Sequence, residues 1–289
     1  MAKRKSVLDF YKMKESGEKV SWITAYDAPT ASLAEQAGIE MLLVGDSVGM
    51  CVYGNGGTNE MTMPTMLGHT SAVRRAAMNT FVIGDMPFLS YQISCEEAVA
   101  NAGAFIRVGA DAIKLEGGRR VAPQIRAISD AGIVVFGHIG LTPQSSGQLG
   151  GFKAQGLTAE SAADMIADAE AVQEAGARFL LVEAVAPEVT AIIREKLTIP
   201  VYGIGAGPHT DGELLIVADL LGIFEAFKPK FVKRYANLAV EMKKAFEAYR
   251  ADVKNLAFPG PEHVYNMLPG ELEKLRAAEG KAKGKGKRG

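Results

Sequence analysis

The chain has 289 residues, of which 48% are hydrophobic, and its formal net charge is −1 at pH 7. This apolar content can form a substantial core and excludes a globally disordered chain. A net charge so close to zero gives no electrostatic reason to expect binding to nucleic acid or to a membrane surface.

Strand-like and helix-like patterns alternate along almost the whole chain, which is typical of a parallel sheet with crossover helices. The expected strands are the short apolar runs 20–25, 41–44, 81–83, 112–115, 133–136, 179–182 and 201–204. The expected helices cover residues 30–37, 65–78, 96–108, 159–175, 187–197 and 231–251. For an eighth strand the only candidate is 223–227.

The expected strands are continuous apolar runs, which indicates a sheet buried on both faces. Seven units and a weaker eighth favour an α/β protein of the (β/α)8 (TIM) barrel type over an open sheet. No Gly-x-Gly-x-x-Gly motif follows the first strand, so the main argument for a dinucleotide fold is missing. We expect one catalytic barrel domain over 1–265, followed by a C-terminal extension over 266–289.

The end of the chain is basic, because residues 281–289 carry five positive charges and no acid. We expect a disordered, solvated tail there; an arm that binds nucleic acid is the weaker interpretation, since no aromatic residue is present. Cys51 and Cys95 form no metal-binding or disulfide pattern, which suits a reducing cytoplasm. The basic N-terminus lacks the apolar core of a signal peptide, and no apolar run approaches the roughly 20 residues of a membrane span.

Three of the apolar runs end in a carboxylate, namely Asp46, Asp85 and Glu116. In a parallel barrel these side chains would converge at the carboxyl ends of the strands. Three converging acids repel one another unless a cation neutralises them, and hard oxygen ligands suit Mg²⁺ or Mn²⁺. A single Asp after a strand is more often a helix cap. Three on consecutive strands favour a metal site.

Three further polar residues lie at expected strand ends. Lys114 shares a strand face with Glu116 and could bind a substrate carboxylate or form a structural ion pair. His138 follows the fifth strand and could polarise a carbonyl, ligate a metal or be purely structural. Glu183 ends the sixth strand and is a candidate general base, with a ligand or ion-pair role as the alternative.

Taken together, ten ordered segments between about residues 20 and 265 resemble the ketopantoate hydroxymethyltransferase (3-methyl-2-oxobutanoate hydroxymethyltransferase) family. The matching segments are 44–50, 69–75, 85–88, 114–118, 137–144, 150–156, 181–183, 203–207 with 211–212, 229–231 and 258–263. Val48 and Ala154 are mild departures, and the Lys/Gly tail lies outside the family pattern.

The resemblance implies a (β/α)8 barrel transferase of pantothenate biosynthesis. It implies transfer of a hydroxymethyl group from 5,10-methylenetetrahydrofolate to 3-methyl-2-oxobutanoate through a Mg-stabilised enolate, giving 2-dehydropantoate and tetrahydrofolate. The implied metal ligands are Asp46, Asp85 and Glu116. Asp46, Ser47, Asp85 and Lys114 are implied to bind substrate, and Glu183 to be the base. His138 could assist proton transfer. The implied assembly is a homodecamer.

Two rival readings remain. A metal-dependent keto-acid aldolase or lyase of the phosphoenolpyruvate mutase and isocitrate lyase kind would use the same barrel, metal and enolate without folate. The Lys-x-Cys-Gly-His loop usual in those enzymes is absent from this sequence. The other reading is a non-catalytic nucleic-acid-binding protein that uses its basic tail, and loss of all function on trimming residues 281–289 would support it.

Overall fold

Eight parallel strands form a closed barrel, in which each strand pairs with the next along the chain and β8 pairs with β1. The computed structural model describes residues 4–285. The strands are β1 (Val20–Thr24), β2 (Met41–Val44), β3 (Phe81–Asp85), β4 (Ala112–Glu116), β5 (Val135–Gly140), β6 (Phe179–Glu183), β7 (Val201–Ile204) and β8 (Gly212–Leu215). The expected (β/α)8 architecture is confirmed, and each of the first seven strands overlaps a predicted run.

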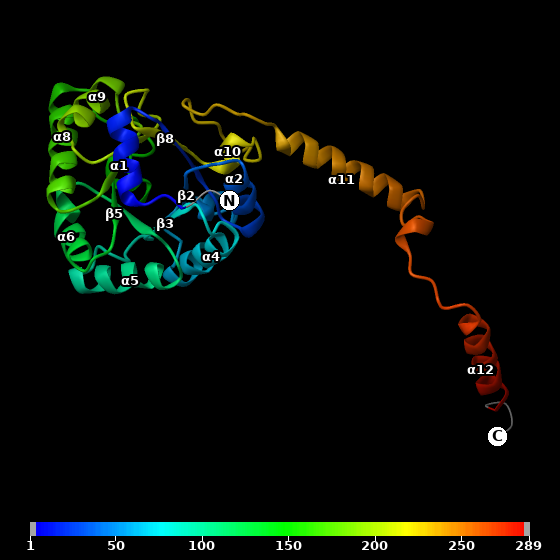
Figure 1. The fold of residues 1–289 in the computed structure, drawn as a ribbon. Coiled ribbons are helices and arrows are strands. Elements are labelled where there is room, and N and C mark those ends of the chain that lie inside the picture. The colour runs from blue at the N-terminus through cyan, green and yellow to red at the C-terminus, as the bar shows by residue number, and fades with distance from the viewer. Residues whose placement is uncertain (1–3, 286–289) are drawn as a thin grey trace. The chain divides into compact units, whose positions relative to one another are not determined.

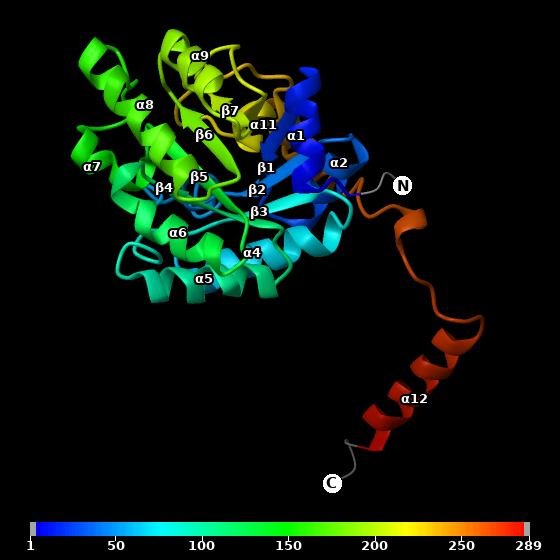
Figure 2. The same cartoon turned by 60° about the vertical axis from the view of Figure 1, so that its left-hand side comes forward.

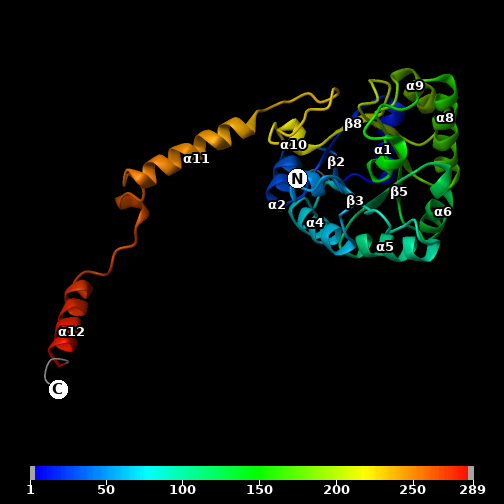
Figure 3. The same cartoon turned by 180° about the vertical axis from the view of Figure 1, so that it is seen from behind.

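Helices surround the barrel, as Figures 1 and 3 show for α2, α4, α5, α6, α8 and α9. The helices are α1 (Val7–Ser16), α2 (Ala28–Gln36), α3 (Val48–Cys51), α4 (Met63–Ala76), α5 (Cys95–Arg107), α6 (Ala122–Asp130), α7 (Ser146–Leu149), α8 (Ala159–Glu174), α9 (Pro187–Lys196), α10 (Val217–Leu220), α11 (Leu238–Lys254) and α12 (Glu271–Lys285). Several begin at a side chain that caps the first turn. Asp27 accepts a hydrogen bond from the Thr30 amide, and Ser94 accepts one from the Glu97 amide.

The prediction of the eighth strand was wrong. Strand β8 is Gly212–Leu215, whereas residues 223–227 follow α10 and belong to no strand. Gly212 pairs with Val20 on one side and with Tyr202 on the other. A Cβ atom on Gly212 would lie 2.3 Å from the Val20 carbonyl oxygen, so the close approach of the strands requires glycine. The glycine and the exposed Glu213 interrupt the apolar run by which the other strands could be recognised.

Aromatic and aliphatic side chains of the strands and of α1 form one core cluster inside the barrel. Figure 2 shows the strands of the barrel with α1 beside them. The rings of Phe136 and Phe179 stack at 4.3 Å between centroids, and Trp22 lies 5.2 Å from Phe136. Helix α1 closes the amino-terminal end, since its Phe10 packs edge-on against Phe81 at the start of β3. Because alternate residues share a face of a strand, His138 lies one layer above Phe136. Polar groups inside the barrel are therefore displaced toward the carboxyl ends of the strands.

The chain divides into two compact units, Met1–Asn237 with the barrel and Leu238–Gly289 with α11 and α12. The domain boundary that the sequence predicts at residue 265 falls within the second unit and stays a prediction. Residues 281–285 of the tail expected to be disordered belong to helix α12, and residues 286–289 lie outside the described residues. Among the described helices, none combines the length and apolar character that crossing a membrane requires.

Candidate active site at the carboxyl ends of the strands

A continuous line of charged side chains crosses the mouth of the barrel from β2 to β6. The Asp46 amide donates to Asp85 Oδ2 at 3.1 Å, and Lys114 Nζ lies 2.7 Å from Asp85 Oδ1 and 3.4 Å from Glu116 Oε1. His138 then lies between Glu116 and Glu183. The structure thus brings together the residues predicted to meet, and all of them except Glu183 are buried in the strand ends.

Lys114 is the central positive charge of this cluster. Burial favours the neutral amine, but Asp85, Glu116 and Asp46 outweigh burial and hold the pKa of Lys114 above its usual range. Burial alone would raise the pKa of Glu116, but Lys114 and His138 outweigh this effect, and the pKa of the carboxyl is lowered. The Lys114–Glu116 pair is therefore ionised at neutral pH.

Asp46 and Asp85 are less well neutralised. Burial and the nearby charge of Asp85 raise the pKa of Asp46 well above its usual range, and Lys114 only partly offsets them. Burial also raises the pKa of Asp85, despite its contact with Lys114. This end of the cluster carries an excess of negative charge that an added cation would relieve.

His138 occupies the other end, with Nδ1 3.4 Å from Glu116 Oε1 and Nε2 3.2 Å from Glu183 Oε2. These are ion-pair contacts, and neither ring nitrogen has the alignment of a hydrogen bond. Burial and Lys114 lower the pKa of His138, but Glu116 and Glu183 prevail and raise it to about 9. The ring is therefore an imidazolium at neutral pH, which links two carboxylates from different strands.

Ser47 lies beside Asp46 at the start of α3 and is only partly buried. Its Oγ atom is 2.8 Å from the hydroxyl of Tyr26, which follows β1 and is itself buried. Tyr26 thereby fixes the position of a hydroxyl group at the edge of the cluster. Nothing in the sequence around Tyr26 indicated this contact.

Gln144 and Tyr91 are two further site residues that the sequence reasoning missed. Both are buried, and they hydrogen-bond to each other and to groups of the acidic cluster. Gln144 belongs to a segment that carried the family resemblance, and its position just after a buried strand was the available signal. Tyr91 lies in the loop between β3 and α5, which has no pattern that points to a site.

The donor chemistry at Asp46 and Asp85 fits Mg²⁺, because both offer buried carboxylate oxygens in excess of the local positive charge. Within residues 4–285, no three His, Cys, Asp or Glu side chains form a ready-made metal cluster. Magnesium commonly takes one or two protein carboxylates and completes its coordination with water and substrate oxygens. The metal-binding roles of Asp46, Asp85 and Glu116 therefore stay predictions.

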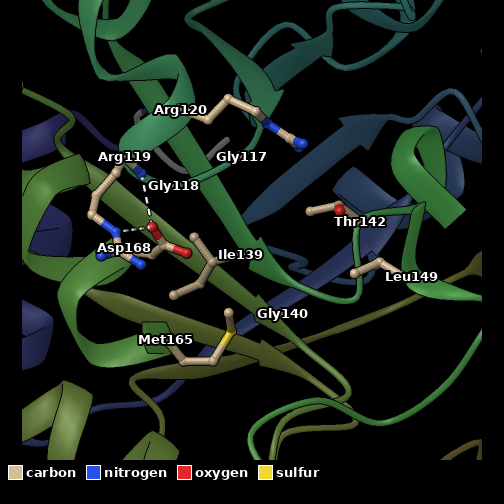
Figure 4. A pocket seen from close by; sticks show the side chains of 10 residues that line it. All are labelled: Gly117, Gly118, Arg119, Arg120, Ile139, Gly140, Thr142, Leu149, Met165 and Asp168. Atoms are coloured by element: carbon tan, nitrogen blue, oxygen red, sulfur yellow. Dashed lines mark hydrogen bonds and ion pairs between the residues drawn. The ribbon is translucent and has the colours of Figure 1, made fainter. Parts of the chain in front are cut away.

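A pocket of about 350 Å³ lies between the ends of β4 and β5 and helix α8 (Figure 4). Its apolar floor comes from Ile139 and Met165, and Arg119 forms ion pairs with Asp168 and Asp164 at its rim. No predicted site residue lines this pocket. Asp168 and Arg119 already pair with each other in this pocket. We therefore place the reaction at the charged cluster and not in the pocket.

Fold and site together define an α/β barrel enzyme with a buried cluster of charges at the strand ends. The family model described as Ketopantoate hydroxymethyltransferase matches residues 4–261. The chain belongs to this family.

The match to this chain spans nearly the whole length of several curated relatives. A 3-methyl-2-oxobutanoate hydroxymethyltransferase of Alkaliphilus metalliredigens is 61% identical over 95% of this chain and 98% of the relative. Proteins of the same name from Syntrophobacter fumaroxidans and Bacillus subtilis are 53% and 49% identical, over 91% and 94% of this chain and 94% and 98% of the relatives. The resemblance seen in the sequence is confirmed.

Solved structures of other enzymes share the fold. Phosphonopyruvate hydrolase, in a complex with oxalate and Mg²⁺, aligns with a TM-score of 0.59 at 14% identity over 98% of each chain. A 2,3-dimethylmalate lyase of the PEP mutase/isocitrate lyase superfamily aligns with a TM-score of 0.55 at 17% identity, again over 98% of each chain. At such low identity the likeness establishes the barrel and not the reaction.

Proposed function

We propose that the protein transfers a hydroxymethyl group from 5,10-methylenetetrahydrofolate to 3-methyl-2-oxobutanoate, giving 2-dehydropantoate and tetrahydrofolate. The observation that carries this proposal is the line of buried charges from Asp46 to Glu183 in the barrel mouth of a family member. The names of the relatives supply the acceptor substrate and the transferred group, and the folate donor follows from the family resemblance.

The substrate is an α-keto acid, whose carboxylate needs a positive partner and hydrogen-bond donors. Lys114 and the Ser47 hydroxyl offer these at one side of the cluster. Asp46, Asp85 and Glu116 would hold Mg²⁺. When bound, this ion stabilises negative charge that develops on the substrate. Orientation by these groups would present the C3 hydrogen of the substrate to Glu183.

Glu183 is the group that we place in the role of general base. It is the least buried acid of the line, with 16% of its side chain exposed, and it lies at the end of β6. Its carboxylate would take the C3 proton, and the C–H electron pair would become the C2–C3 double bond of the enolate. The C3 carbon then bonds to the methylene carbon of the folate. One C–N bond of the folate methylene breaks as this C–C bond forms, and water then displaces the second nitrogen and becomes the hydroxyl group. The C3 proton and one proton of water complete the two N–H groups of tetrahydrofolate.

The position of His138 supports this assignment, because its Nε2 atom lies 3.2 Å from Glu183 Oε2 and so fixes the side of the mouth on which this carboxylate lies. Its contact with Glu116 on the other side links the base to the predicted metal site. His138 is thus a candidate for an accessory role, either in holding Glu183 in place or in passing on the proton.

Proton NMR in D₂O tests the proposal directly. The protein is incubated with 3-methyl-2-oxobutanoate, with and without Mg²⁺, and methylenetetrahydrofolate is then added. We expect metal-dependent loss of the C3 proton signal, followed by formation of 2-dehydropantoate only in the presence of the folate. Exchange without the folate-dependent product would favour a keto-acid lyase. Absence of exchange from the folded, metal-loaded protein would overturn the proposed mechanism.

We also propose a cytoplasmic homo-oligomer, a decamer as the family resemblance implies. Helix α11 supports self-association, because Phe246 and Tyr249 expose 64% and 60% of their surface. Cys51 and Cys95 are both free thiols, which supports the reducing compartment. Sedimentation velocity tests the assembly, and a monomer at micromolar concentration would contradict it. Cell fractionation tests the location.

A further inference from the structure

Gln144 is an uncharged residue that hydrogen-bonds to the carboxylates of two different acids of the cluster. It lies in the turn after β5, with only 3% of its surface exposed. Its side-chain amide donates to Asp46 Oδ2 and to the Met86 carbonyl, both at 2.9 Å. Its backbone amide donates to Glu116 Oε2 at 3.0 Å. One residue thus ties an acid that follows β2 to an acid on β4.

The contact to Asp46 has no substitute. Among residues 4–285, Gln144 is the only group that donates a hydrogen bond to the Asp46 carboxylate. Asp46 follows its strand instead of lying within it, so its orientation depends on this bond. Glu116 is held on both sides, because Oε1 faces Lys114 and Oε2 accepts from Gln144.

The orientation of the Gln144 amide is itself fixed. Its Oε1 atom lies 2.8 Å from the Tyr91 hydroxyl and 3.3 Å from Gln92 Nε2. A flipped amide would turn its oxygen toward Asp46 Oδ2 and the Met86 carbonyl, which are both acceptors. Tyr91 also accepts from the Glu116 amide at 3.0 Å, so the same hydroxyl group connects Gln144 to the β4 strand.

We propose that Gln144 is a positioning residue, which sets the mutual geometry of Asp46 and Glu116 and is required for tight binding of the divalent ion. This inference rests on the proposed function, in which these acids hold the metal. Gln144 touches neither the reacting carbon nor the base in this arrangement; it acts through the two carboxylates. Residues that orient metal ligands from behind commonly contribute 10- to 100-fold to metal affinity.

The test compares Mn²⁺ binding, followed by the EPR signal of the free ion, in the full-length protein and three variants. Gln144→Met keeps the length of the side chain and removes its donors and acceptor. Tyr91→Phe removes the hydroxyl group that orients the Gln144 amide and that also bonds to the Glu116 backbone. Gln173→Met is the matched control, because the Gln173 oxygen accepts hydrogen bonds from Thr198 and Ile199 on the outer side of the barrel. Thermal unfolding of each protein monitors stability separately.

We expect Gln144→Met to raise the Kd for Mn²⁺ by roughly 10- to 100-fold and Tyr91→Phe to raise it by about 3- to 10-fold. In the C3–H exchange assay, the metal concentration for half-maximal rate should rise more than the maximal rate falls. Gln173→Met should lower only the unfolding temperature. If Gln144→Met does not fold, the Tyr91→Phe result decides.

Mn²⁺ affinities within twofold of wild type in the folded variants would overturn the role of Gln144, whatever their stability. Loss of stability without loss of affinity would show that Gln144 is merely structural. Wild-type protein that binds Mn²⁺ but exchanges no C3 proton would contradict the proposed function alone, since the binding comparison stands without the reaction.

Discussion

The Nε2 atom of His138 lies 3.2 Å from the Oε2 atom of Glu183, while Nδ1 of the same ring lies 3.4 Å from Oε1 of Glu116. A single buried ring therefore connects the expected base on β6 with an expected metal residue on β4. The positive charge of the ring neutralises part of the charge of both acids.

Replacing Glu183 with glutamine removes the group that accepts the C3 proton and keeps the shape of the side chain. We expect the exchange rate in D₂O to fall by about 10²- to 10⁴-fold, with Mn²⁺ affinity changed little. Glu188→Gln is the matched control, because Glu188 is an exposed acid in the first turn of α9. Unchanged exchange in the Glu183 variant would remove this residue from the role of base.

The raised pKa of His138 predicts a pH-dependent contribution to stability in the metal-free protein. A group whose pKa is about 9 when folded and 6.5 when free stabilises the fold fully below pH 6.5. This contribution disappears as the pH rises through 9. Relative to His138→Gln, wild type should be more stable by on the order of 2–3 kcal/mol at pH 6 and by much less at pH 10.

Urea unfolding in EDTA at pH 6, 8 and 10, at one protein concentration, measures this difference. The charged groups that face the ring are Lys114, Glu116 and Glu183, and all three are present in both proteins. A difference that grows with pH would show that His138 is buried in its neutral form.

The sequence made the charged residues of the site predictable, because each follows a short apolar run in a chain of alternating elements. Parallel strands then determine that Asp85, Glu116 and Glu183 meet at one end of the barrel. Lys114 and His138 also lie on barrel strands, so their proximity to these acids could be predicted from the same parallel arrangement. The metal and base roles of these residues stay predictions.

Strand β8 and the partners of the acids could not be predicted in this way. Gly212 and Glu213 break the apolar signal of β8, whose position depends on the gap between β7 and β1. Tyr26, Tyr91 and Gln144 lie in loops, and no periodicity relates a loop side chain to a group far away in the chain. Only the three-dimensional path of these loops brings them to the cluster.

Cys51 should be a slow nucleophile despite its position near Ser47 in the sequence. Burial raises the pKa of its thiol to about 11, so only about one thiol in a thousand is ionised at pH 8. In a Cys95→Ser background, the rate of iodoacetamide labelling should rise roughly tenfold per pH unit between pH 8 and 10. A rate that levels off below pH 9 would contradict the raised pKa.

Lys114→Met should be strongly destabilising in the metal-free protein. Lys114 is buried between Asp85 and Glu116, and its loss leaves two buried carboxylates without their shared cation. Breaking a buried ion pair in this way typically lowers the free energy of unfolding by about 3–5 kcal/mol. Urea titration in EDTA measures this loss.

Lys196→Met is the matched control for this prediction. Lys196 pairs with Glu170 at 2.7 Å, but both side chains are more than 40% exposed. An exposed pair contributes only about 0–1 kcal/mol. Mg²⁺ should raise the unfolding temperature of Lys114→Met more than that of wild type or Lys196→Met, because the ion then replaces a missing positive charge. A Lys114 variant that loses less than about 1 kcal/mol, or that gains no more from Mg²⁺ than the control does, would show that the carboxylates do not depend on Lys114 for their neutralisation.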